Sequence, residues 1–74
     1  VYSTCFWPNR IFDDTVTELS RLENAYLVSL SDMDADPSYK AYGKFAHAGV
    51  AAHPGDKGMR EIAERIFAAI QKSL

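Results

Sequence analysis

Apolar and polar positions follow two different periods along residues 1–30. Two short apolar runs, residues 1–6 and 25–30, are rich in β-branched and aromatic side chains, which is typical of strands. Between them, from about Arg10 to Ala25, apolar side chains recur at helical spacing. The order strand, helix, strand is typical of a right-handed β-α-β unit with parallel strands. The pattern therefore predicts an α/β fold.

A second amphipathic helix is predicted at the end of the chain, from about Asp56 to Lys72. Asp56 is its expected N-cap, because a carboxylate accepts hydrogen bonds from the first free amides of a helix. Apolar side chains fall on one stripe of this helix and most polar ones on the other side. The stripe consists of Met59, Ile62, Ala63, Ile66, Phe67 and Ile70, and the polar side of Arg60, Glu61, Glu64, Arg65, Gln71 and Lys72.

Residues 31–52 are expected to be largely irregular, because Asp, Pro and Gly interrupt every period there. A helical turn is possible at 37–42, with Pro37 at its first position. No internal repeat or low-complexity tract divides the chain, so we expect a single, partial domain over residues 1–74. A chain of this length buries only about 60% of its unfolded surface, so its stability is marginal.

The predicted sheet is too small to be complete. Parallel strands normally carry helices on both faces, and two strands with two helices leave apolar faces and strand edges uncovered. The missing cover is expected from a second copy of the chain in a homo-oligomer, from another chain, or from a missing N-terminal part of the domain. The chain opens on Val1, without an initiator Met and inside a predicted strand, which also suggests a piece of a longer protein.

Composition argues against several classes of function. The formal net charge of −2 gives no basic face, so we expect no nucleic acid as a partner. No apolar run approaches the roughly 20 residues of a membrane span. Cys5 is the single cysteine, so no disulfide can form within the chain, and with two histidines it does not supply four zinc ligands. We expect neither a metal nor a cofactor.

One loop carries a candidate for chemistry, the stretch AAHPGDKGM at residues 51–59, just before the last helix. Pro54 fixes the backbone directly after His53, and Gly55 permits a tight turn. A general base needs such immobility, because proton transfer requires hydrogen-bond reach to the nucleophile, and an imidazole titrates near neutral pH. His53 is therefore the candidate catalytic residue. The alternative interpretation is a surface histidine in a capped turn.

The stretch HPGDKGMREIAERIFAAI resembles the last conserved segment of the SGNH hydrolases, also called GDSL-like esterases and lipases. In that family the catalytic histidine lies in an H-P-x-x-x-G turn, followed by a helix that reads roughly IA..I. The strand YSTCFWPN, the helix after it and the strand YLVSL are similar to the penultimate strand, helix and last strand of the family's flavodoxin-like, three-layer fold. The resemblance covers the whole chain as the C-terminal β-α-β-loop-α part of such a domain. The residues that match the histidine segment are His53, Pro54, Gly58, Ile62, Ala63 and Ile66.

This resemblance implies a hydrolase that acts on acyl or carbohydrate esters through a seryl nucleophile and an acyl-enzyme. His53 would take the proton of the serine hydroxyl and later protonate the leaving group. The family's Gly-Asp-Ser nucleophile block and its oxyanion-hole glycine and asparagine are absent from the sequence, so the chain alone is expected to be a poor enzyme or none. No G-x-S-x-G elbow is present either, so there is no candidate nucleophile among Ser3, Ser20, Ser29, Ser31, Ser38 and Ser73.

The sequence leaves open which group orients the imidazole. The family's usual triad acid lies three residues before the histidine, and here that position is Val50. The alternatives are a backbone carbonyl, one of Asp32, Asp34 and Asp36, or no group at all. The three aspartates also imitate the first ligands of an EF-hand loop for Ca²⁺, but the glycine and glutamate that such a loop needs are missing. A solvated acidic loop at the carboxyl end of a strand is the favoured interpretation.

A second class of function is a non-catalytic, independently folding oligomeric or interaction module derived from such a domain. The uncovered apolar faces of the last helix and of both strands favour it. Among the other notable residues, Tyr2, Phe6 and Trp7 are predicted to be core rather than a ligand platform. His47 is predicted to be exposed and Cys5 to be buried.

Overall fold

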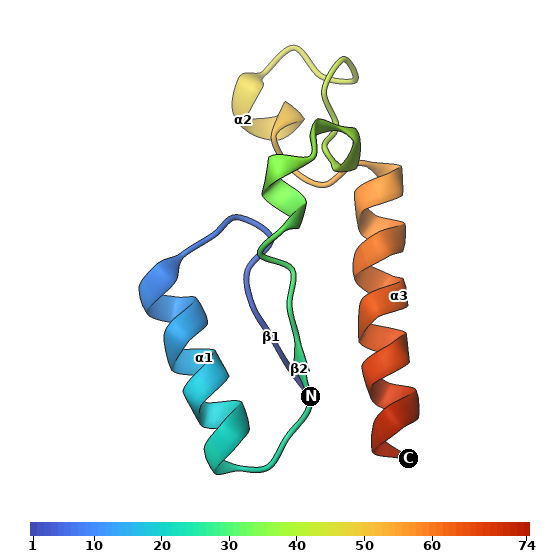
Figure 1. The fold of residues 1–74 in the computed structure, drawn as a ribbon. Coiled ribbons are helices and arrows are strands. Elements are labelled where there is room, and N and C mark those ends of the chain that lie inside the picture. The colour runs from blue at the N-terminus through green and yellow to red at the C-terminus, as the bar shows by residue number, and fades with distance from the viewer.

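A computed structural model describes the whole chain, Val1–Leu74. Two short strands come first, with a long helix between them, and are followed by two 3₁₀ turns, a short helix and a long C-terminal helix (Figure 1). In chain order the elements are β1 (Tyr2–Ser3), α1 (Arg10–Leu22), β2 (Leu27–Val28), η1 (Met33–Ala35), η2 (Pro37–Tyr39), α2 (Ala48–Ala51) and α3 (Asp56–Ser73).

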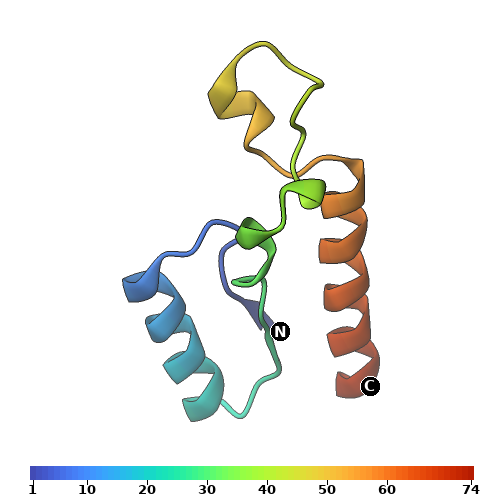
Figure 2. The same cartoon turned by 45° about the horizontal axis from the view of Figure 1, so that its top comes forward.

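The two strands form a parallel sheet with a helix on either side. Tyr2 pairs with Leu27 and Ser3 with Val28, which confirms the predicted parallel pairing of the strands on either side of α1. Figures 1 and 2 show α1 and α3 on opposite sides of β1 and β2, so the chain has three layers. The α/β class is therefore confirmed at this level.

Both strands are shorter than the six-residue runs that the pattern predicts, because side chains take over the hydrogen bonds at their ends. Thr4 donates its backbone N–H to the Val28 carbonyl, but its hydroxyl then accepts the N–H of Leu30 at 2.7 Å in place of a backbone carbonyl. The N–H of Cys5 donates to the Asp13 carboxylate at 2.9 Å. The chain thus leaves the sheet toward α1 instead of extending the ladder.

Helix α1 has well-defined caps at both ends. Asn9 is the N-cap, and its side chain accepts the N–H of Phe12 at 3.1 Å. At the other end Asn24 adopts a left-handed φ of 52°, and the N–H of Ala25 donates to the Ser20 carbonyl at 2.8 Å. This is a Schellman motif, and it ends the helix at Leu22, three residues before the predicted end at Ala25.

The predicted irregular segment contains more local structure than expected. Pro37 does open a helical turn, but this turn ends at Tyr39. The short helix α2 is not predicted by any periodicity. Asp56 as the N-cap of the last helix is wrong: Gly55 is the N-cap and Asp56 is the first helical residue, where its carboxylate still favours the positive end of the helix dipole.

The buried core lies between the strands and α3. It consists of Phe6, Val28, Leu30, Met33 and Ala69, with Tyr39, Ile62 and Ile66 packed against it. The predicted apolar stripe of α3 is only partly covered, because Met59, Phe67 and Ile70 remain 55%, 60% and 42% exposed. The expected uncovered apolar surface is therefore present, and α1 adds to it with Ile11 and Leu22 at 81% and 65% exposure. No helix of the chain combines the length and apolar character needed to cross a membrane.

Candidate functional site

The turn that carries His53 is fixed to the segment before it by backbone hydrogen bonds. The His53 carbonyl accepts the N–H of Ala41 at 2.9 Å, and the N–H of Gly55 donates to the Tyr39 carbonyl at 2.9 Å. Gly58 completes this attachment, because a Cβ built on it would lie 2.1 Å from the Tyr39 oxygen. The first turn of α3 can therefore pack against η2 only if residue 58 has no side chain.

The imidazole of His53 is exposed and is held by the carbonyl of Gly49. Its Nδ1 lies 2.7 Å from that oxygen. A carbonyl oxygen can only accept, so Nδ1 carries the hydrogen and donates it. In the neutral ring Nε2 is then the nitrogen without a proton, and this nitrogen makes no hydrogen bond within the chain. The arrangement presents a free base to solvent.

Trp7 holds the other side of this loop. Its indole Nε1 donates to the Ala52 carbonyl at 3.1 Å, and its ring packs edge to face against His53 with centroids 4.7 Å apart. Trp7 lies on the segment that leaves the carboxyl end of β1, and Figure 1 shows α2 and the start of α3 beyond the carboxyl ends of the strands. His53 therefore lies at that edge of the sheet, where ligand sites of open α/β folds are found. Trp7 itself is 42% exposed, so its prediction as core is wrong, whereas Phe6 is buried.

His47 also forms a hydrogen bond with Gly49, but its ring nitrogen is the acceptor, whereas that of His53 is the donor. The N–H of Gly49 donates to Nδ1 of His47 at 3.1 Å, so this nitrogen carries no hydrogen and the neutral ring is protonated at Nε2. His47 is exposed, as predicted, but it presents a donor to solvent and acts as the N-cap of α2. The two backbone groups of Gly49 thus select opposite tautomers in the two histidines.

No carboxylate orients the imidazole of His53, so of the three alternatives the backbone carbonyl is the one observed. Asp32 binds Arg65, Asp34 lies 2.6 Å from the Lys40 ammonium, and Asp36 accepts from Ser38. Val50, three residues before His53, has no carboxylate to offer and is 43% exposed. The three aspartates have separate partners, and no group of three or more His, Cys, Asp or Glu side chains could hold a metal ion.

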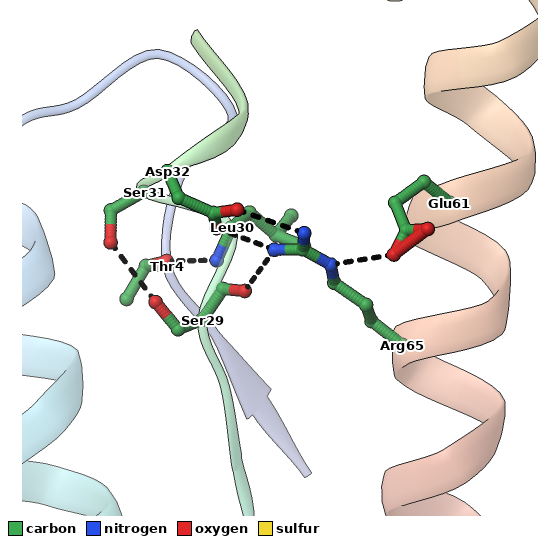
Figure 3. A network of polar contacts seen from close by, with 7 residues as sticks. All are labelled: Thr4, Ser29, Leu30, Ser31, Asp32, Glu61 and Arg65. Carbon is green, nitrogen blue, oxygen red and sulfur yellow. Dashed lines mark hydrogen bonds and ion pairs between the residues drawn. The ribbon is translucent and has the colours of Figure 1, made fainter. Parts of the chain in front are cut away.

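An arginine network ties α3 to the carboxyl end of β2 (Figure 3). The Arg65 guanidinium makes two hydrogen bonds to Asp32, one of them at 2.9 Å, and donates 3.0 Å to the Ser29 carbonyl. Its Nε donates to Glu61 at 2.9 Å. The prediction that Glu61 and Arg65 lie on the outer side of the helix is therefore wrong. These two side chains face β2, because the acidic loop supplies Arg65 with a bidentate partner.

The Asp32–Arg65 pair makes stability depend on pH in acid. The hydrogen bonds from Arg65 lower the pKa of Asp32 below its ordinary value. The pair contributes fully above the unfolded-state pKa of a carboxyl group, about 4, and its contribution is lost as the pH falls through the folded-state pKa. We expect Asp32→Asn to lower the free energy of unfolding by about 1 kcal/mol at neutral pH and to have a smaller effect near pH 2. Urea denaturation at both pH values measures this difference.

Asp14→Asn is the control for this pH effect. Asp14 lies 3.8 Å from Arg10, and both side chains are more than 70% exposed, at 76% and 93%. We expect no measurable change in stability from this substitution at either pH. An equal loss from both substitutions at neutral pH would show that the network of Figure 3 contributes no more than an ordinary surface pair.

Two features of the site have no clear signal in the sequence. Trp7 is separated from His53 by most of the chain, and only the rule that ligand sites lie at the carboxyl ends of strands connects them. The sequence places Gly49 between His47 and His53, but its hydrogen bonds to both rings depend on the fold of α2. A scan against protein-family models, a search of curated proteins and a search of solved structures each found no match to this chain.

Proposed function

We propose that residues 1–74 are the C-terminal part of an SGNH-type serine ester hydrolase with a flavodoxin-like fold, and that His53 is its general base. The observation that carries this proposal is the hydrogen bond from Nδ1 of His53 to the Gly49 carbonyl. In the neutral ring this bond leaves Nε2 without a hydrogen, on an exposed side chain at the carboxyl edge of the strands. That is the place and the protonation state which proton abstraction from a serine hydroxyl requires.

In the proposed reaction Nε2 of His53 takes the proton of a seryl hydroxyl that another part of the domain supplies. The serine oxygen attacks the acyl carbon of the ester, and the resulting imidazolium protonates the departing alcohol as the acyl-enzyme forms. His53 then takes a proton from water, whose oxygen attacks the acyl carbon. The bond to the serine oxygen breaks, the imidazolium returns the proton to that oxygen, and the carboxylic acid is released. Gly49 accepts from Nδ1 throughout, but a carbonyl dipole stabilises the imidazolium less than the carboxylate of a full triad does.

The incomplete core supports the view that the domain continues beyond these elements. The sheet has two strands of two residues each, and both of its edges are free of further strands. Only 11 of the 74 residues are buried, and large apolar side chains are exposed on both long helices. A domain that included the nucleophile would cover this surface with further strands and helices.

The test of this proposal is ester hydrolysis by the isolated chain. We expect p-nitrophenyl acetate to be hydrolysed no faster than by free imidazole at the same concentration, because the chain has no nucleophile block. His53→Ala should remove most of this background rate, whereas His47→Ala should remove little of it, since Nδ1 of His47 already accepts a hydrogen bond. Turnover of about 1 s⁻¹ or more by the isolated chain would contradict the partial-domain proposal.

The exposed apolar surface also favours the second candidate, a non-catalytic oligomeric or interaction module. In that case the surface of α1 and α3 is buried in an assembly, and His53 has only a structural role. Light scattering on the purified chain distinguishes the candidates, because the module predicts a defined oligomer. A folded monomer would count against the module.

A further inference from the structure

A cavity of about 530 Å³ lies beside the His53 turn, between residues 38–45 and the start of α3. Pro54 and Gly55 form part of its wall, so it shares the turn with His53, whose ring does not line it. Phe45 and Met59 contribute apolar surface. The cavity is larger than an inorganic phosphate ion needs, and it has room for a small organic group as well.

Positive charge is concentrated in this cavity. Three of the four lysines of a chain with net charge −2 line it, namely Lys40, Lys44 and Lys57, against the single carboxylate of Asp56. The ammonium of Lys40 lies 2.6 Å from Asp34, so its charge is largely compensated. Neither Lys44 nor Lys57 takes part in any of the ion pairs of the structure. Two cationic groups therefore line the cavity without a carboxylate at ion-pair distance.

Lys57 is held in place although it lacks a carboxylate partner. Its Nζ donates to the hydroxyl of Ser38 at 2.8 Å and lies 5.0 Å from the centre of the Tyr39 ring. The Ser38 hydroxyl in turn donates to Asp36 at 2.7 Å. Ser38 is thus a positioning residue for the lysine, and the other hydrogens of the ammonium remain free to bind an acceptor. An ammonium that is ordered in advance loses less entropy when it binds an anion.

We propose that this cavity binds a phosphate monoester of a small organic group. The phosphate lies between the ammonium groups of Lys44 and Lys57, and the organic group lies against Phe45 and Met59. A phosphate monoester offers three terminal oxygens to these two ammonium groups, whereas a carboxylate offers two. This binding site is independent of ester hydrolysis, so it does not rest on the proposed role of His53.

Binding is tested by ¹H–¹⁵N NMR titration of the whole chain with glycerol 3-phosphate, with inorganic phosphate and with glycerol as the uncharged counterpart. We expect saturable shifts of the amides of Ala41, Gly55 and Lys57 with both phosphates, a higher affinity for glycerol 3-phosphate, and no shifts with glycerol. Equal affinity for glycerol 3-phosphate and inorganic phosphate would contradict the proposal that Phe45 and Met59 contact the organic group. Shifts that do not saturate, or that are spread over the whole chain, would contradict the site itself.

Lysine variants test whether the cavity supplies the charge. Lys44→Met and Lys57→Met should each weaken binding of glycerol 3-phosphate by about threefold to tenfold, the loss expected for one charge-assisted hydrogen bond. Lys72→Met, at the exposed end of α3 and outside the cavity, is the matched control and should leave the affinity unchanged. His53→Ala should also leave it unchanged. A loss in Lys72→Met equal to that in the cavity variants would show non-specific attraction and overturn the proposal.

Discussion

His53→Ala is expected to lower kcat of ester hydrolysis by about 100- to 10,000-fold in a protein that contains this chain together with the nucleophile-bearing part of the domain. The loss follows from the proposed role of Nε2, which in the neutral ring is the nitrogen that carries no hydrogen. KM should change little, because the imidazole contacts the reacting atoms rather than the remainder of the substrate. Initial rates with a chromogenic acyl ester measure both parameters.

The control for this prediction is His47→Ala, because His47 is equally exposed and bonds to the same glycine. We expect it to retain activity, with at most a small loss of stability from the missing N-cap of α2. An equal loss of activity in both variants would point to collapse of the loop around Gly49 rather than to loss of a base. Full activity in His53→Ala would remove His53 from the mechanism.

Gly58→Ala is expected to lower the free energy of unfolding by about 2–3 kcal/mol, although alanine favours a helix over glycine by about 1 kcal/mol. The new Cβ would lie 2.1 Å from the Tyr39 oxygen and 3.2 Å from Cβ of Pro54. Because the first of these atoms belongs to the backbone, the start of α3 has to move away from η2. The hydrogen bond from Gly55 to the Tyr39 carbonyl would be strained by the same movement.

Gly49→Ala is the matched control for the stability of the Gly58→Ala variant. Its Cβ would meet only atoms of the exposed His47 ring, at 3.0 Å and 3.2 Å, and that ring can turn away. We expect a change within about 1 kcal/mol, measured for both variants by urea denaturation at neutral pH. If Gly58→Ala is no less stable than Gly49→Ala, the close packing of α3 on η2 is wrong.

The two long amphipathic helices are the part of the fold that the sequence predicts well. α3 begins at Asp56 as expected, and α1 begins at Arg10, because apolar side chains at helical spacing dominate both segments. The strand ends could not be predicted, since they depend on the hydroxyl of Thr4 and the carboxylate of Asp13, which compete with the backbone ladder. The polar side of α3 could not be predicted fully either, because Arg65 faces β2 and binds Asp32 there.

The sequence selects His53 as the candidate residue, and its catalytic role stays a prediction. The geometry around its ring could not be predicted. The proline after His53 and the turn at Gly55 indicate a fixed imidazole, and the ring is held by a definite hydrogen bond. Which group holds it depends on α2, a helix of four residues that has no periodic signal of its own. The contact with Trp7 depends on the pairing of β1 with β2, which brings the N-terminal segment to the turn before α3.

The proposed mechanism depends on the Gly49 carbonyl, which fixes the hydrogen of the neutral His53 ring on Nδ1 and leaves Nε2 without one. Long-range ¹H–¹⁵N NMR of the two imidazoles in their neutral form measures this directly, because protonated and bare ring nitrogens differ widely in chemical shift. We expect a hydrogen on Nδ1 in His53 and on Nε2 in His47. A spectrum with the hydrogen of His53 on Nε2 would contradict it, because the ring would then offer solvent a donor instead of a base.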